Sequence, residues 1–248
     1  MQETMSARKK FTGTGKPPGT TRRAAVRPAV RKRVLLVDDH PMLRAGLVEL
    51  VNKQPDMEVS CDAASAAEGL GEIQRCRPEL MVTDITLPGR SGVEFIKDAL
   101  ALEPRLPILV LSMHNEMIYA ERVLQAGARG YIMKEASPEE LLTAIRRVLA
   151  GGIYVSAEMS ARLLAGLAAS RPRSSSSPIK KLSDREFEVF RLLGQGLATA
   201  TIGKRLNLSA KTVATHRINL KAKLGIATAA ALISCAAQWV TADGPDHE

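Results

Sequence analysis

The chain has few aromatic residues, few cysteines and no long apolar segment. Phe, Trp and Tyr together make up 3% of its 248 residues, whereas the apolar class reaches 45%, so its core must be mainly aliphatic. No apolar run approaches the roughly 20 residues that a membrane-spanning helix needs. The amino terminus also lacks the apolar centre of a signal peptide. We therefore expect no membrane span and no secretion.

The three cysteines, Cys61, Cys76 and Cys235, are odd in number and widely separated. Their spacing fits no metal-binding pattern, and secreted disulfide-rich domains use many more. We expect buried free thiols in a reducing compartment, which favours a cytoplasmic protein.

The net charge of +9 is unevenly distributed. Residues 1–33 have a net charge of +9, residues 34–178 of −4 and residues 179–248 of +4. Residues 1–30 have no periodic apolar positions, which predicts a disordered basic tail. Such a tail can add non-specific affinity for nucleic acid. We favour the alternatives that it is inert or reflects a start codon assigned too far upstream.

Between residues 31 and 153, short apolar segments alternate with amphipathic ones. The pattern predicts strands at 34–37, 57–61, 80–84, 107–112 and 131–134, each followed by a helix. Such alternation is typical of a parallel sheet with helices on both faces. We expect an α/β domain of the flavodoxin-like (βα)5 type with strand order 2-1-3-4-5.

Polar residues stand where these strands end. They are Asp38, Asp39, Asp84, Ser112 and Lys134. The carboxyl ends of parallel strands share one edge, where open α/β sheets bind ligands. In the order 2-1-3-4-5 the first and third strands are neighbours, so the three carboxylates converge. They would repel one another unless a cation such as Mg²⁺ joined them.

Lys134 and Ser112 add a positive charge and a hydroxyl that suit a phosphoryl group. Taken singly, Asp84 could cap a turn, Asp39 could cap a helix, Ser112 could simply end a strand and Lys134 could be a solvated turn residue. Their joint occurrence favours a site that orients a phosphoryl group for transfer to Asp84.

Four segments carry a resemblance to a known family. They are Val37-Asp38-Asp39-His40, Thr83-Asp84-Ile85-Thr86-Leu87-Pro88-Gly89, Leu111-Ser112-Met113 and Gly130-Tyr131-Ile132-Met133-Lys134. Together they resemble the receiver domain of two-component response regulators. One departure is Glu135, where many receivers have proline after the lysine.

The resemblance implies a role for each matching residue. Asp84 would be the phosphoacceptor, and Asp39 and Asp84 would bind Mg²⁺ directly. Asp38 would bind the ion through water, and Thr86 through its backbone carbonyl. Ser112 and Tyr131 match the switch pair, and Lys134 matches the family's lysine.

Residues 154–179 predict a helical extension over 154–170, followed by a Ser/Pro-rich linker. Residues 180–248 then form an all-helical region. Ser183 and Glu186 have capping-box spacing, a short helix is expected at 199–206, and a longer one runs from 210 to Gly225. This spacing is typical of a helix-turn-helix.

The 210–224 helix has four Lys or Arg residues and no acidic residue. A solvated cationic face is one explanation, but the preceding turn favours DNA binding. The expected DNA-contacting residues are Lys211, Thr212, Thr215, Arg217, Ile218 and Lys221.

The C-terminal region resembles the LuxR-type helix-turn-helix of the NarL/FixJ class. The match rests on Leu182-Ser183-Asp184-Arg185-Glu186, on Gly196-Leu197 and on Leu208 to Arg217 with Lys223-Leu224-Gly225. Ala198–Gly203 and Ala214 depart from the family pattern, which removes polar groups. The family implies a dimer contact at helix 228–240, with an ordinary core helix as the equal alternative.

These observations predict a response regulator. A sensor histidine kinase would phosphorylate Asp84, and this would control binding to double-stranded DNA and transcription. A homodimer is expected on phosphorylation, and RNA polymerase is a further candidate partner. No enzyme activity is expected beyond the receiver's own phosphorylation and dephosphorylation.

Two alternatives stand beside this hypothesis. A Mg²⁺-dependent phosphatase would usually have a second carboxylate two residues after the nucleophile, where this chain has Thr86. A constitutive DNA-binding protein or scaffold with a silent receiver would not need the complete five-residue set.

Overall fold

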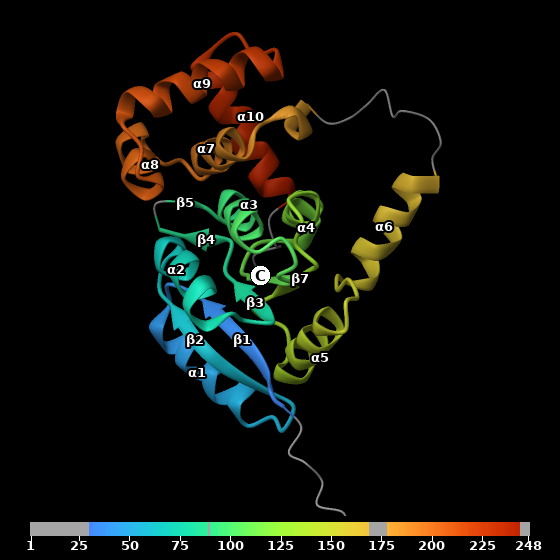
Figure 1. Cartoon of the computed structure of the whole chain (residues 1–248). Coiled ribbons are helices and arrows are strands. Elements are labelled where there is room, and N and C mark those ends of the chain that lie inside the picture. The colour runs from blue at the N-terminus through green and yellow to red at the C-terminus, as the bar shows by residue number, and fades with distance from the viewer. Residues whose placement is uncertain (1–29, 89, 169–177, 244–248) are drawn as a thin grey trace, which may run out of the picture. The chain divides into compact units, whose positions relative to one another are not determined.

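The computed structural model describes residues 30–88, 90–168 and 178–243 (Figure 1). The predicted basic tail lies outside these residues except at its last position. Most of the predicted Ser/Pro-rich linker lies outside them as well.

A five-stranded parallel sheet forms the centre of the first region (Figure 1). Its strands are β1 (Lys32–Val37), β2 (Met57–Ala63), β3 (Leu80–Thr83), β6 (Ile108–Ser112) and β7 (Gly130–Met133). The spatial order is β2-β1-β3-β6-β7. Numbered among themselves, the five strands have the predicted order 2-1-3-4-5, which confirms the flavodoxin-like prediction.

Helices cover both faces of the sheet because successive strand residues point to opposite sides. They are α1 (Pro41–Asn52), α2 (Ala66–Cys76), α3 (Gly92–Leu102), α4 (Glu116–Gln125) and α5 (Pro138–Leu149). On one side, Val34 and Leu36 pack with apolar residues of α1 and α5. On the other, Leu35 and Val37 share a core with residues of α2, α3 and α4, including Phe95. The core is mainly aliphatic, as the composition predicts.

A small hairpin, absent from the predictions, follows β3. The two-residue strands β4 (Thr86–Leu87) and β5 (Arg90–Ser91) pair antiparallel. Segments this short have no apolar alternation from which to be predicted. Gly92, directly after β5, approaches the backbone of Ile85 so closely that a Cβ atom would overlap the Ile85 carbonyl oxygen. The loop after Asp84 is therefore held against the start of α3.

The chain returns to the sheet edge after α5. The Tyr154 carbonyl accepts a hydrogen bond of 2.8 Å from the Tyr131 N–H, and the Tyr154 N–H donates one of 3.0 Å to the Arg129 carbonyl. This pairing forms a parallel bridge between Gly130 and Tyr154. The predicted helix at 154–170 therefore begins later, as α6 (Ala157–Ala168).

Ser137 caps α5 by accepting a 3.2 Å bond from the Glu140 N–H. Glu140 Oε1 accepts a 2.9 Å bond from the Tyr154 hydroxyl. The same tyrosine thus pairs with β7 and ties down the start of α5.

The C-terminal region contains a short 3-10 turn, η1 (Pro178–Lys181), and four helices. They are α7 (Asp184–Gly194), α8 (Thr199–Leu206), α9 (Ala210–Leu224) and α10 (Ala229–Asp243). Ser183 and Glu186 form the predicted capping box at α7. Asn207 and Gly225 end α8 and α9 with φ values of 52° and 68°, the left-handed conformation that suits these residue types. The predicted helix-turn-helix is confirmed as α8 and α9.

The cysteine expectation is wrong for two of the three residues. Cys61 in β2 and Cys76 at the end of α2 are joined by a disulfide, with their Cα atoms 6.5 Å apart. The packing of α2 against β2 brings the two residues together. Their spacing in the sequence does not predict this contact. Cys235 is a free, half-buried thiol.

Within the described ranges, no single helix has the length and apolar character needed to cross a membrane. The bent pair formed by α9 and residues 229–241, with 77° between its arms, passes that test by length and composition only.

Candidate functional site

The backbone hydrogen bonds of the sheet bring the predicted site residues to one edge. The Asp84 N–H donates to the Val37 carbonyl at 2.8 Å, continuing the β1–β3 pairing past Thr83. On the other side, the Lys134 N–H donates to the Ser112 carbonyl at 2.8 Å and continues the β6–β7 pairing. The side chains that follow these strands therefore emerge together, as predicted.

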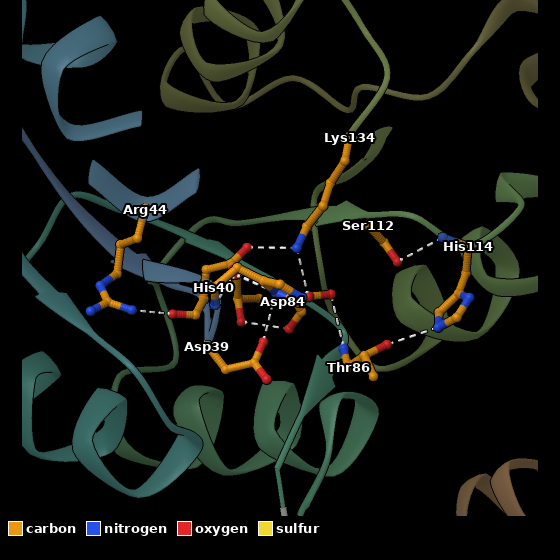
Figure 2. Close-up of polar contacts among 10 residues, drawn as sticks. Asp39, His40, Arg44, Asp84, Thr86, Ser112, His114 and Lys134 are labelled. Carbon is orange, nitrogen blue, oxygen red and sulfur yellow. Dashed lines mark hydrogen bonds and ion pairs between the residues drawn. The ribbon is translucent and has the colours of Figure 1, made fainter. Parts of the chain in front are cut away.

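Three carboxylates and one imidazole form an acidic cluster at this edge (Figure 2). One ligand atom from each of Asp38, Asp39, His40 and Asp84 lies within 4.8 Å of the others. Asp38 and Asp84 are only 2% and 3% exposed, whereas Asp39 is half-buried and His40 lies at the surface. The cluster thus has a buried floor and an accessible rim.

Lys134 provides a positive charge at the floor of the acidic cluster. Its Nζ lies 2.7 Å from Asp38 Oδ2 and 2.8 Å from Asp84 Oδ2 (Figure 2). Burial by itself would lower the pKa of Lys134, but the hydrogen bonds to Asp38 and Asp84 outweigh it and raise the pKa. Lys134 therefore remains an ammonium group that can also meet an incoming phosphoryl oxygen.

Asp84 carries an electrostatic cost that Lys134 does not cancel. Burial raises the pKa of Asp84 more than the bonds from Lys134 and from the Thr86 N–H, the latter 2.9 Å from Oδ1, lower it. The Asp38 carboxylate adds a further upward contribution. One ammonium group thus faces three acids, a set of oxygen donors that suits a hard cation such as Mg²⁺.

Ser112 and Tyr131 both contact the backbone of His114 rather than the acidic cluster. The His114 N–H donates to Ser112 Oγ at 3.1 Å, and the Tyr131 hydroxyl donates to the His114 carbonyl at 2.6 Å. Both side chains are fully buried. The two residues that match the switch pair, Ser112 and Tyr131, therefore both hold the backbone of His114 in the loop after β6.

His114 joins this loop to the loop after Asp84. Its Nε2 lies 2.8 Å from Thr86 Oγ1 (Figure 2), and its ring stacks on Tyr119 with centroids 5.2 Å apart. Burial lowers the pKa of His114 to about 3, so the ring is neutral. His114 is not among the predicted site residues, and its position two residues after Ser112 is the only signal in the sequence.

Arg44 is a second residue that the sequence analysis missed. From α1 it donates to the Asp38 carbonyl at 2.6 Å and to Asp62 Oδ2 at 2.7 Å. It thereby fixes the backbone on which the acidic cluster stands. Its place in an otherwise ordinary amphipathic helix gave no sign of this contact.

The six predicted DNA-contacting residues divide into two groups on α9. Lys211, Thr215 and Ile218 are exposed, Ile218 by 64%, although it is apolar. Thr212 and Lys221 are half-buried, and the Thr212 N–H donates to Oγ of Ser209, the residue that caps α9, at 3.0 Å. Five of the six therefore remain candidates for groove contacts.

Arg217 differs from the other five. Its Nη1 donates to Thr199 Oγ1 at 2.7 Å, which ties α9 to the start of α8. Lys223 likewise binds Glu186 Oε2 at 2.6 Å and holds α9 against α7. These two cations stabilise the packing of the helices. A count of the basic residues in the sequence does not separate this role from contact with DNA.

Comparison with known families and proteins agrees with both regions. The family model "Response regulator receiver domain" matches residues 34–146, and "Bacterial regulatory proteins, luxR family" matches residues 180–236. The chain is 35% identical over 193 residues to transcriptional regulatory protein UhpA of Salmonella typhimurium, covering 78% of this chain and 91% of that protein.

Two further similarities span most of the chain. The oxygen regulatory protein NreC of Staphylococcus aureus is 33% identical over 208 residues, covering 82% of this chain and 96% of that protein. The structure of RcsB from Salmonella enterica serovar Typhimurium, bound to promoter rprA with the phosphomimetic BeF3−, has a TM-score of 0.59 and 26% identity. It covers 84% of this chain and 99% of that one.

Proposed function

Because the chain belongs to the LuxR family of two-component response regulators, with a receiver domain and a DNA-binding domain, we propose that Asp84 accepts the phosphoryl group that controls it. The donor would be a sensor histidine kinase, and the output would be altered binding to double-stranded DNA and altered transcription. The observation that carries the proposal is the convergence of Asp38, Asp39, Asp84 and Lys134 at one sheet edge.

Mg²⁺ fits the acidic cluster, which offers oxygen donors and excess negative charge. Asp39, Asp84 and the Thr86 carbonyl would hold the ion directly, and Asp38 would hold it through water. When bound, the ion would neutralise carboxylate charge and bind phosphoryl oxygens.

The transfer itself needs an ionised and correctly oriented Asp84. The Thr86 N–H holds Oδ1 and the Lys134 ammonium holds Oδ2, so the carboxylate is fixed in one orientation. An Asp84 oxygen attacks phosphorus while the bond from phosphorus to the donor's imidazole nitrogen breaks. The product is an acyl phosphate whose new negative charge lies beside Lys134.

The new phosphoryl group would then accept a hydrogen bond from the Ser112 hydroxyl, and turning this side chain towards it would move Oγ away from the His114 N–H, from which it now accepts. Losing that bond would loosen the loop after β6. Tyr131 is fully buried in this structure, and its hydroxyl donates to the His114 carbonyl. It would act by retaining or releasing the His114 carbonyl, a local event that can bias a two-state surface.

The proposed output is DNA binding by α9 in a homodimer. Two copies would place their α9 helices in half-sites about 34 Å apart, one turn of duplex. Helix α10 would supply the dimer contact, RNA polymerase is a further proposed partner, and the cytoplasm is the proposed location.

The phosphoacceptor is tested by acid-labile labelling. Wild type, Asp84→Ala and Glu135→Gln would be incubated with a radioactive small-molecule phosphodonor and Mg²⁺. We expect label on wild type and on Glu135→Gln, a change at the exposed residue that follows Lys134 in sequence, and none on Asp84→Ala. Equal labelling of wild type and Asp84→Ala would refute the assignment.

The output is tested by footprinting with and without the phosphodonor. Protection that increases on phosphorylation in wild type, and stays constant in Asp84→Ala, supports phosphorylation control. Identical protection in all four conditions would instead indicate a constitutive DNA-binding protein with a silent receiver.

A further inference from the structure

A pair of cysteines lies within the receiver region and plays no part in the proposed phosphorylation. Cys61 is in β2 and Cys76 is the last residue of α2, with 15 residues of sequence separation. The structure joins their sulfur atoms, and the 6.5 Å between their Cα atoms lies within the range of protein disulfides. The fold therefore presents two sulfurs ready to bond without backbone movement.

A permanent structural disulfide does not suit a transcription regulator. Such a protein works beside DNA, in compartments that keep thiols reduced, where disulfides are usually transient and serve catalysis or sensing. We propose that Cys61 and Cys76 form a reversible thiol–disulfide pair, oxidised by low-molecular-weight disulfides such as glutathione disulfide, with Cys76 attacking and Cys61 resolving.

Exposure assigns the order of attack. Cys76 is half-buried, whereas Cys61 is 7% exposed and belongs to the apolar core beneath α2. Glutathione disulfide, which is bulky, can reach Cys76 Sγ but not Cys61 Sγ. The mixed disulfide therefore forms on Cys76, beside the sulfur that resolves it.

The charged groups beside Cys76 largely offset one another. Cys76 Sγ lies 3.1 Å from Glu72 Oε2, a carboxylate whose charge disfavours a neighbouring thiolate. The same carboxylate oxygen lies 2.6 Å from Arg75 Nη2, which offsets that charge. Cys61 Sγ lies 3.7 Å from the neutral hydroxyl of Ser60. The order of attack therefore rests on the greater exposure of Cys76.

The exchange balances in two steps. The Cys76 thiolate attacks one sulfur of glutathione disulfide, the S–S bond of that molecule breaks, and glutathione thiolate leaves and takes up a proton. Cys61 then loses its proton and attacks Cys76 Sγ, which expels the second glutathione. Two protein thiols are oxidised and one small disulfide is reduced to two thiols.

The test uses the full chain in a Cys235→Ser background, so that only the pair can react. Reduced protein is mixed with glutathione disulfide, quenched in acid at intervals and weighed intact. The chain with both cysteines should lose two hydrogens without keeping an adduct. The Cys61→Ser variant should retain one glutathione on Cys76, and Cys76→Ser should react at least tenfold more slowly.

Equal adduct rates on the two single variants would overturn the order of attack. A stable adduct on the chain with both cysteines, or no intramolecular bond at all, would overturn the pair. Circular dichroism of each variant shows that the fold is intact, so that a slow reaction reports chemistry and not unfolding.

Thermal melting gives an independent readout, because a cross-link closing a 15-residue loop stabilises the folded chain. Oxidation should raise Tm by on the order of 10 °C in the chain with both cysteines and leave both single variants unchanged. Cys61, Glu72 and Cys76 could also hold a metal ion. Stoichiometric Zn²⁺ that survives gel filtration and prevents oxidation by glutathione disulfide would replace the redox proposal with a metal site. None of these measurements depends on Asp84.

Discussion

The ionisable residues at the sheet edge have their charges set by burial. Burial raises the pKa of Asp84 and lowers the pKa of His114, which is therefore neutral. Hydrogen bonds to two carboxylates raise the pKa of Lys134, which stays charged. These differences give pH-dependent contributions to stability whose signs can be worked out residue by residue.

Asp84→Asn should stabilise the protein without Mg²⁺. Since the pKa of Asp84 is raised in the fold, the folded state binds more protons than the unfolded state above the usual value of 3.8. Its contribution to stability is therefore lost as pH rises through that window, and at pH 7 the ionised group is destabilising. The neutral amide should raise Tm by a few degrees at pH 7, measured by thermal denaturation in EDTA. A lower Tm for the variant would contradict this account, and Glu135→Gln should leave Tm unchanged.

His114→Gln should make the protein less sensitive to acid. The folded pKa of His114 is about 3, against 6.5 for the free side chain, so the unfolded state binds more protons between these values. The stability due to His114 is complete above pH 6.5 and is lost as pH falls, by about 1.4 kcal/mol per pH unit. Urea denaturation at pH 7.5, 6.5 and 5.5 should show this slope in wild type and not in the variant. A His114→Gln variant that kept the full slope would refute the assignment.

At the scale of single residues, the groups that stand at strand ends are predictable from the sequence, and those that support them are not. Asp38, Asp84 and Lys134 were predictable because strand ends are visible as apolar runs followed by polar residues. His114 and Arg44 act through contacts with Thr86 and with the Asp38 carbonyl, which only the packed loops create.

At the scale of elements, the approach of Gly92 to Ile85 fixes the loop after Asp84. Gly92→Ala would place a Cβ atom against the Ile85 carbonyl oxygen and push that loop outward. We expect a loss of about 1–3 kcal/mol in the free energy of unfolding, the usual cost of overpacking, with slower labelling of Asp84. Chemical denaturation and the phosphodonor assay measure the two effects.

Gly71→Ala is the matched control for this change. Gly71 lies in α2 with nothing within 4 Å of its would-be Cβ, so alanine should stabilise the helix by about 0.5–1 kcal/mol. If both variants behaved alike, the close contact at Gly92 would not be what positions the loop.

Element prediction succeeded where local signals are strong. Helices α8 and α9 begin and end at the predicted residues because Ser209, Asn207 and Gly225 supply caps and turns. The β4–β5 hairpin was not predicted, because two-residue strands have no apolar periodicity. The Cys61–Cys76 contact was not predicted, because it depends on how α2 packs against β2.

At the scale of the whole molecule, DNA binding should depend on salt through the exposed cations of α9. Lys211→Ala should weaken binding and reduce the slope of log K against log salt by about 1, if Lys211 contacts a phosphate. Fluorescence anisotropy across a salt series measures this slope. Lys53→Ala, on the exposed end of α1 beside Glu49, should leave it unchanged. Arg217→Ala should instead lower Tm, because Arg217 joins α9 to α8.

The return of Tyr154 to β7 also has a consequence for where the receiver can be cut. Strand β7 is the last in the sheet, and the segment around Tyr154 occupies backbone groups on its outer side. A fragment that ends at residue 146, the limit of the receiver family match, would leave the outer edge of β7 unpaired. Unpaired edge strands pair with strands of neighbouring copies. Such a fragment should self-associate, whereas one that continues through Ser156, whose N–H donates to Glu116, should stay monomeric in its unphosphorylated form.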